Sequence, residues 1–111
     1  NLGIVIDKDT NIPIRGALLR VFNSERQLDV AITDINGRYN LYLEPGEYFI
    51  KIDAPGYIFP TETATNIVVN KLGEKLFKFT IQDEQKLGLK FYMQKYSNLH
   101  VKQQVVLSPF S

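Results

Sequence analysis

The chain has 111 residues, which is enough for one domain. It contains no Cys and no Trp, one His and one Met, and this excludes thiol catalysis, disulfide scaffolds, Cys-based zinc sites and Trp-lined sugar platforms. The net charge of +1 gives no argument for nucleic acid or an anionic membrane as a partner. No apolar run approaches the roughly 20 residues that span a bilayer, so no transmembrane segment is expected in this chain.

Alternation of apolar and polar residues dominates the first three-quarters of the chain and predicts β-strands. Turn signals separate the strands, among them Asn36-Gly37, Pro45-Gly46 and Pro55-Gly56. Strands at this spacing are typical of an all-β sandwich. We expect seven strands, over residues 2–6, 17–22, 28–33, 39–44, 48–53, 67–69 and 77–81. In the first of them, Leu2, Ile4 and Ile6 share one face.

The turns and strands occur in an order that is similar to a known family. The segments that carry the similarity are Gly3–Asp7, Thr10, Pro13-Ile14, Gly16-Ala17, Val21, Thr33–Tyr39, Leu41, Pro45–Tyr48, Ala54–Tyr57, Asn66–Val69 and Phe77–Ile81. Over about residues 2–82 the chain resembles the carboxypeptidase regulatory-like domain, a seven-stranded Greek-key β-sandwich of the prealbumin-like (transthyretin-like) type. The resemblance implies a non-catalytic module in an extracellular or periplasmic setting, beside an enzyme, a transporter or other surface domains.

Collagen-adhesin B-type domains share this fold and often carry a Lys–Asn isopeptide bond. That bond needs a Lys in the first strand and a buried acid in the strand before the Ala-Pro-Gly-Tyr turn. Here Lys8 lies in the turn and Ile52 stands at the place of the acid, so no crosslink is expected.

Oxygen-bearing side chains gather in three turns that antiparallel strands would bring to one end of the sandwich. Such side chains are ligands for Ca²⁺. The alternative is that Asp and Asn cap their own turns, as they commonly do. The candidate calcium ligands are Asp7, Asp9, Asn11, Asp34, Asn36 and Asp53.

No arrangement of residues indicates catalysis. His100 is the only imidazole, no Ser lies in a nucleophile motif, and no acid/base pair of carboxylates is recognisable. We therefore expect no enzymatic activity and no cofactor other than the candidate calcium.

Residues 84–111 differ from the rest in charge and in family pattern. They carry four Lys against one Glu, whereas residues 1–83 carry nine Lys and Arg against eleven Asp and Glu. We interpret 1–83 as the sandwich and 84–111 as a C-terminal extension, most simply a β-hairpin that docks on the sandwich or on a neighbour. A helix remains the alternative, since Leu89, Met93 and His100 also fall at helical spacing.

Exposed aromatic and apolar residues supply candidates for an interaction surface. Tyr42, Phe49 and Tyr92 fall opposite the main apolar stripe, where they either pack under residues 84–111 or bind a ligand. The full candidate set is Tyr42, Phe49, Phe91, Tyr92, Val105 and Leu107.

These features predict an extracellular or cell-surface structural module that binds adjacent domains or copies of itself. A carbohydrate-binding module and an accessory domain of a larger secreted enzyme or transporter are the alternatives.

Overall fold

A computed structural model describes residues 3–82, 85–86 and 88–99 of the chain. The described residues form β-strands joined by turns and end in one short 3-10 helix, η1 (Tyr96–Asn98). The strands are β1 (Gly3–Asp7), β2 (Leu18–Phe22), β3 (Gln27–Ile32), β4 (Arg38–Tyr39), β5 (Tyr42–Leu43), β6 (Gly46–Asp53), β7 (Tyr57–Ile58), β8 (Ile67–Val69), β9 (Lys75–Ile81), β10 (Gln85–Lys86) and β11 (Lys90–Lys95). The predicted all-β sandwich is confirmed.

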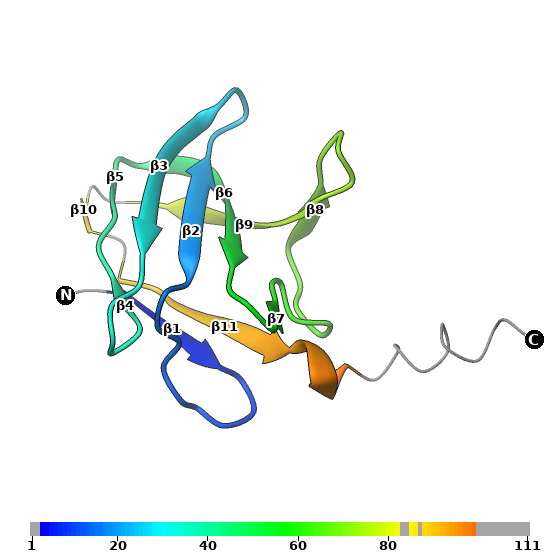
Figure 1. Ribbon diagram of the computed structural model, residues 1–111. Helices are drawn as coiled ribbons and strands as arrows, with labels where there is room; N and C mark the ends of the chain where they lie inside the picture. The colour runs from blue at the N-terminus through cyan, green and yellow to red at the C-terminus, as the bar shows by residue number, and fades with distance from the viewer. Residues whose placement is uncertain (1–2, 83–84, 87, 100–111) are drawn as a thin grey trace, which may run out of the picture.

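Two sheets form the sandwich, as Figure 1 shows. One has four strands in the order β4-β1-β11-β7, and the other has five in the order β3-β2-β6-β9-β8. A third, two-stranded sheet pairs β10 with β5. Every segment predicted to be a strand contains one, but the segment 39–44 is divided between β4 and β5, and β7, β10 and β11 are additional. No helix of the described part of the chain is long and apolar enough to cross a membrane.

The alternation seen in the sequence decides which side chains enter the core. Leu19 and Val21 of β2, and Ile50 and Ile52 of β6, are at most 2% exposed and lie between the sheets. Ile52, at the position where a crosslinking family member would hold an acid, is thus an ordinary core residue. In β1, Val5 lies in the core cluster, and Ile6 on the opposite face is also buried. β1 lies inside its sheet and is covered on both faces, so alternation there does not distinguish inside from outside.

Strand β11 lies within the predicted C-terminal extension, and the structure places it in the four-stranded sheet. It lies between β1 and β7, runs parallel to β1, and pairs Val5 with Phe91. Phe91 and Met93 are 4% and 0% exposed in the core. Residues 90–95 are therefore part of the sandwich, and the helical alternative is wrong for them. The change in net charge near residue 83 therefore reflects the polar outer face of this strand. Its pairing was not predicted, because a parallel partner strand far away in the sequence leaves no local signal.

Candidate functional site

Among the described residues, β7 covers only part of the outer edge of β11. The backbone N–H groups of Ile4 and Lys8 donate to the carbonyls of Leu89 and Met93, so odd-numbered residues of this segment direct their backbone groups toward β1. Even-numbered residues direct theirs the opposite way. On that side β7 pairs only with Gln94 and Lys95. No described strand pairs with the edge at residues 90–92, which we call the β11 edge.

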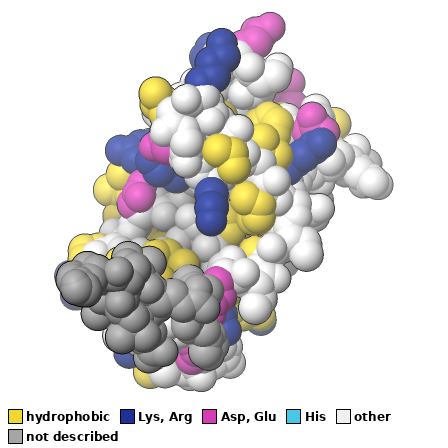
Figure 2. All heavy atoms as spheres, turned by 90° about the vertical axis from the view of Figure 1, so that its right-hand side faces the viewer, with side chains coloured by type: hydrophobic (Ala, Val, Ile, Leu, Met, Phe, Trp, Pro, Cys, Tyr) yellow, Lys and Arg dark blue, Asp and Glu magenta, His cyan; other side chains and the backbone are white. Residues whose placement is uncertain are grey.

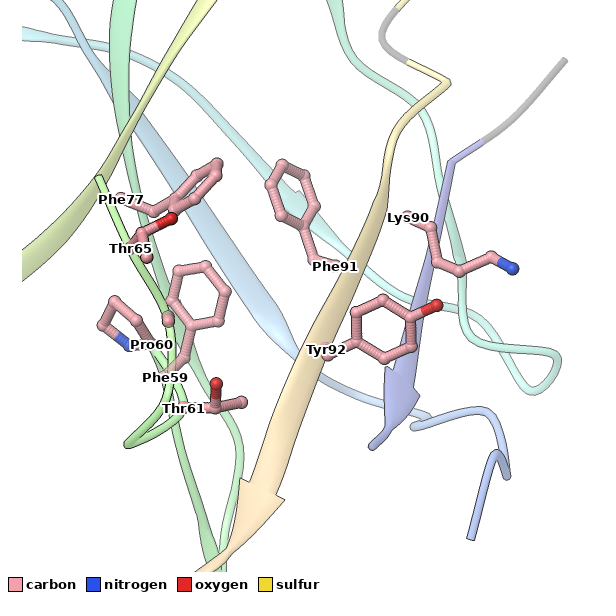
Figure 3. A pocket seen from close by; sticks show the side chains of 9 residues that line it. Phe59, Pro60, Thr61, Thr65, Phe77, Lys90, Phe91 and Tyr92 are labelled. Atoms are coloured by element: carbon pink, nitrogen blue, oxygen red, sulfur yellow. The ribbon is translucent and has the colours of Figure 1, made fainter. Parts of the chain in front are cut away.

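A hollow of about 230 Å³ lies beside the β11 edge. We call it the β11 hollow; it is lined by Phe59, Pro60, Thr61, Ala64, Thr65, Phe77, Lys90, Phe91 and Tyr92. Figure 3 shows the rings of Phe59, Phe77 and Phe91 turned toward one another, with the amine of Lys90 directed away from them. Their ring centroids lie 5.9–6.3 Å apart. Aromatic rings of the core therefore form the floor of a surface hollow.

Residues 59–65 form the wall of the β11 hollow opposite the strand, and part-buried hydrogen bonds to Gln94 fix them there. The N–H of Glu62 donates to Oε1 of Gln94 at 3.0 Å, and Nε2 of Gln94 donates to Oε1 of Glu62 at 3.0 Å. The same Nε2 also donates to the carbonyl of Asn98 at 3.2 Å. Gln94 is only 1% exposed, so these bonds satisfy an amide that would otherwise be costly to bury.

The beginning of β11 is held by Tyr39. Its hydroxyl donates to the carbonyl of Leu89 at 2.6 Å, and burial raises the pKa of Tyr39, which keeps the hydroxyl protonated. Its ring lies over Gly3, its partner in the pairing of β1 with β4. A Cβ atom at Gly3 would lie 2.1 Å from Cζ of Tyr39, so only glycine leaves room for the ring.

The surface on this side of the molecule mixes apolar and charged side chains. Figure 2 looks onto the side that carries β7 and β8, where hydrophobic side chains gather toward the middle, with a Lys or Arg side chain among them and other charged side chains around them. A second hollow of about 480 Å³ shares the lining residues Phe59, Pro60, Thr61 and Ala64 with the β11 hollow. Its walls include Ile58, Ile67, Lys75 and Leu99.

The structure gives the predicted calcium ligands separate hydrogen-bonding roles. Asp7 accepts from the N–H groups of Asp9 and Thr10 at 2.8 and 3.2 Å, and from the hydroxyl of Tyr57 at 3.1 Å. Burial alone would raise the pKa of Asp7, but these hydrogen bonds and the charge of Lys95 together lower it. For Tyr57, burial and the bond to Asp7 raise the pKa.

The side chains of Asp34, Asp53 and Asp9 also have protein partners. Asp34 accepts from the N–H groups of Asn36 and Arg38, each at 2.9 Å, as a turn cap does. Asp53 forms an ion pair with Arg20 at 3.1 Å. Oδ2 of Asp9 accepts from Nδ2 of Asn98 at 3.0 Å, and Asn11 takes a positive φ of 64° in its turn. Among the residues that the structure describes, no three His, Cys, Asp or Glu side chains are grouped to hold a metal ion.

The predicted interaction residues do not form one surface. Phe91 and Tyr92 both line the β11 hollow. Tyr42 lies elsewhere, opposite Lys86 of β10, and lines a separate hollow of about 420 Å³. Phe49 is partly buried on the outer face of the five-stranded sheet, between Phe22 and Lys78 in register. Val105 and Leu107 lie outside the described residues.

Sequence reasoning missed most of the hollow. Phe77 was expected only as a strand residue, and Phe59 and Thr65 lie in a stretch without periodicity. The one signal in the sequence is Pro60, which directly follows the apolar pair Ile58-Phe59 and indicates that a strand ends there, because proline cannot donate to a sheet.

The comparison with protein families decides the relationship of this chain. The family model of the carboxypeptidase regulatory-like domain matches residues 2–94. The chain belongs to this family. The match includes nearly all of β11, in agreement with the place of that strand in the sandwich. Domains of this family are generally non-catalytic modules. No curated protein matches the sequence.

Proposed function

We propose that this carboxypeptidase regulatory-like domain is a non-catalytic protein-interaction module of an extracellular or cell-surface protein, and that the β11 hollow is its binding surface. The observation that carries the proposal is the coincidence of an apolar hollow with a strand edge that no described strand pairs with. Exposed apolar surface with polar surroundings is typical of protein–protein contact sites.

The chemistry of the hollow favours binding over catalysis. Lys90 is the only charged residue among its nine lining residues, and its other polar side chains are two threonines and the phenol of Tyr92. This set offers no nucleophile activated by a base and no pair of carboxylates.

The shape of the hollow favours a polypeptide over a carbohydrate. A sugar platform needs the flat faces of exposed rings. Here Phe91 is 4% exposed, and the rings of Phe59 and Phe77 pack edge-on against it. Tyr92, at 43% exposed, is the one lining ring with a large exposed area.

Selection against two kinds of library tests the proposal. We expect a display library of random peptides to yield binders to the chain, and a glycan array to give no signal. Thr65→Phe, which places a ring in the hollow, should abolish peptide selection. Thr63→Phe, in the same segment but outside the lining, is the matched control. Glycan binding that Thr65→Phe removes would refute the protein-interaction role and support the carbohydrate alternative.

A second candidate function, assembly of copies of the chain, is favoured by the edge strand β3. Val30 and Ile32 are 43% and 65% exposed there. The N–H of Thr33 donates to the carbonyl of Ala17, so the backbone groups of Val30 and Ile32 face outward. The carboxylate of Asp29 accepts the Val30 N–H at 2.8 Å and thereby partly protects this edge from pairing.

Sedimentation velocity over a range of concentrations tests this second candidate. We expect Asp29→Ala to increase self-association, because it releases the Val30 N–H, and Ile32→Lys to decrease it. Leu72→Lys replaces an exposed apolar residue in a turn and should have no effect. A chain that stays monomeric in all variants would exclude assembly through β3 and leave the binding role of the β11 hollow untouched.

A further inference from the structure

We infer that the β11 edge and the β11 hollow together accept an extended segment of a partner protein as an additional strand, with one apolar side chain inserted into the hollow and an acidic side chain next to it beside Lys90. This inference rests on the proposed binding function and adds the class of ligand and the geometry of binding.

The backbone supplies the first part of the argument. The N–H and C=O groups of Lys90 and Tyr92 face away from β1, and β7 ends before it reaches them. An incoming strand would continue the line of β7 along residues 90–92, where these groups are positioned for sheet hydrogen bonds. Strand addition of this kind supplies affinity through the main chain and specificity through pockets for alternate side chains.

The hollow supplies the second part. On an added strand, residues opposite Phe91 face the interior of the sandwich, where the rings of Phe59 and Phe77 form the floor. The volume of about 230 Å³ is below the roughly 300–1,000 Å³ typical of sites for whole small-molecule ligands. It suits a single aromatic or branched aliphatic side chain.

The charge of the rim supplies the third part. Lys90 lies on the opposite face of β11 from Phe91, and its amine points away from the rings. The residue next to the inserted one would stand on this outer face, across from Lys90 or Tyr92. An acidic side chain there would form a cross-strand pair with Lys90. The ligand is therefore an extended peptide in which an acidic residue adjoins an apolar one.

The test is a titration of the full chain with a short peptide in which Thr residues surround a central Phe-Glu pair, followed through the backbone amide NMR signals. We expect saturable shifts at Tyr92 and Thr65. Thr65→Phe should weaken binding by about tenfold or more, and Thr63→Phe should leave it unchanged. Lys90→Glu should reverse the preference, so that a Phe-Lys peptide binds better than the Phe-Glu peptide.

Backbone N-methylation of the peptide, one position at a time, tests the strand geometry. We expect affinity to fall at alternate positions only, since every second N–H of a strand faces its neighbour. Binding that Thr65→Phe removes but that is indifferent to N-methylation would overturn strand addition and leave the proposed binding function intact. Failure of every peptide, selected or designed, would overturn both.

Two other occupants have distinct signatures in the same spectra. If Val105→Asp with Leu107→Asp shifts the Tyr92 and Thr65 signals without peptide, the chain's own C-terminal segment fills the hollow, and the partner proposal is wrong. If those signals depend on protein concentration alone, a second copy fills it, and the partner proposal is likewise wrong.

Discussion

Replacing Gly3 by alanine is a sharp test of how β11 is held in the sandwich. The new Cβ atom would lie 2.1 Å from Cζ and 2.2 Å from the hydroxyl oxygen of Tyr39. Tyr39 is 2% exposed and its ring centroid lies 6.0 Å from that of Phe91, so the ring has no free space to move into. We expect the ring to shift and the bond from its hydroxyl to the carbonyl of Leu89 to break.

The expected loss follows from three contributions. Overpacking a core typically costs about 1–3 kcal/mol. The Leu89 carbonyl keeps its bond from the Ile4 N–H, but the buried Tyr39 hydroxyl loses its acceptor, which adds about 1–3 kcal/mol. Replacing glycine by alanine in a strand returns about 0.5–1 kcal/mol. The free energy of unfolding of Gly3→Ala should therefore fall by about 2–4 kcal/mol.

Urea denaturation of a double-mutant cycle measures this effect. Tyr39→Leu removes the ring, so Gly3→Ala should cost much less in that background, and the difference is the coupling energy. Tyr39→Phe isolates the hydroxyl and should cost about 1–3 kcal/mol. Hydrogen exchange at Phe91 and Met93, whose N–H groups face β1, should rise in Gly3→Ala. Equal losses in both backgrounds, or no loss at all, would refute the role assigned to the ring.

Three further predictions concern the buried polar groups and the candidate metal site. The lowered pKa of Asp7 means that its carboxylate stabilises the fold above the unfolded value of 3.8 and that this contribution is lost as the pH falls through the folded value. The stability difference between wild type and Asp7→Ala should therefore shrink on acidification, and a difference that is constant with pH would contradict this. Gln94→Leu should reduce the free energy of unfolding by about 1–3 kcal/mol and speed hydrogen exchange of the Glu62 N–H. Gln94→Glu retains an acceptor for that N–H, so the Glu62 N–H should exchange more slowly in this variant than in Gln94→Leu. Added calcium or a chelator should leave the melting temperature unchanged, whereas a rise with calcium would support the predicted ligands.

The sequence predicted most of the five-stranded sheet and little of what surrounds the hollow. Alternation in β2 and β6 placed Leu19 and Ile50 in the core, because each strand has one covered face. Alternation could not assign an inward face to β1, because that strand is covered on both faces. It also failed to place β11, because the pairing of Val5 with Phe91 joins residues far apart in the chain and has no local signature.

The β11 hollow results from the position of one proline. β7 is only two residues long and ends at Ile58, directly before Phe59-Pro60. Proline has no N–H to donate to a sheet, so the strand cannot continue along β11. The chain turns away, and the Gln94–Glu62 hydrogen bonds fix it at a distance from the strand. The edge that β7 would have covered stays open, and the core rings behind it form the floor of a hollow. The same local event thus creates both parts of the proposed site, which explains why an unpaired edge and an apolar hollow occur together at this place in the sandwich.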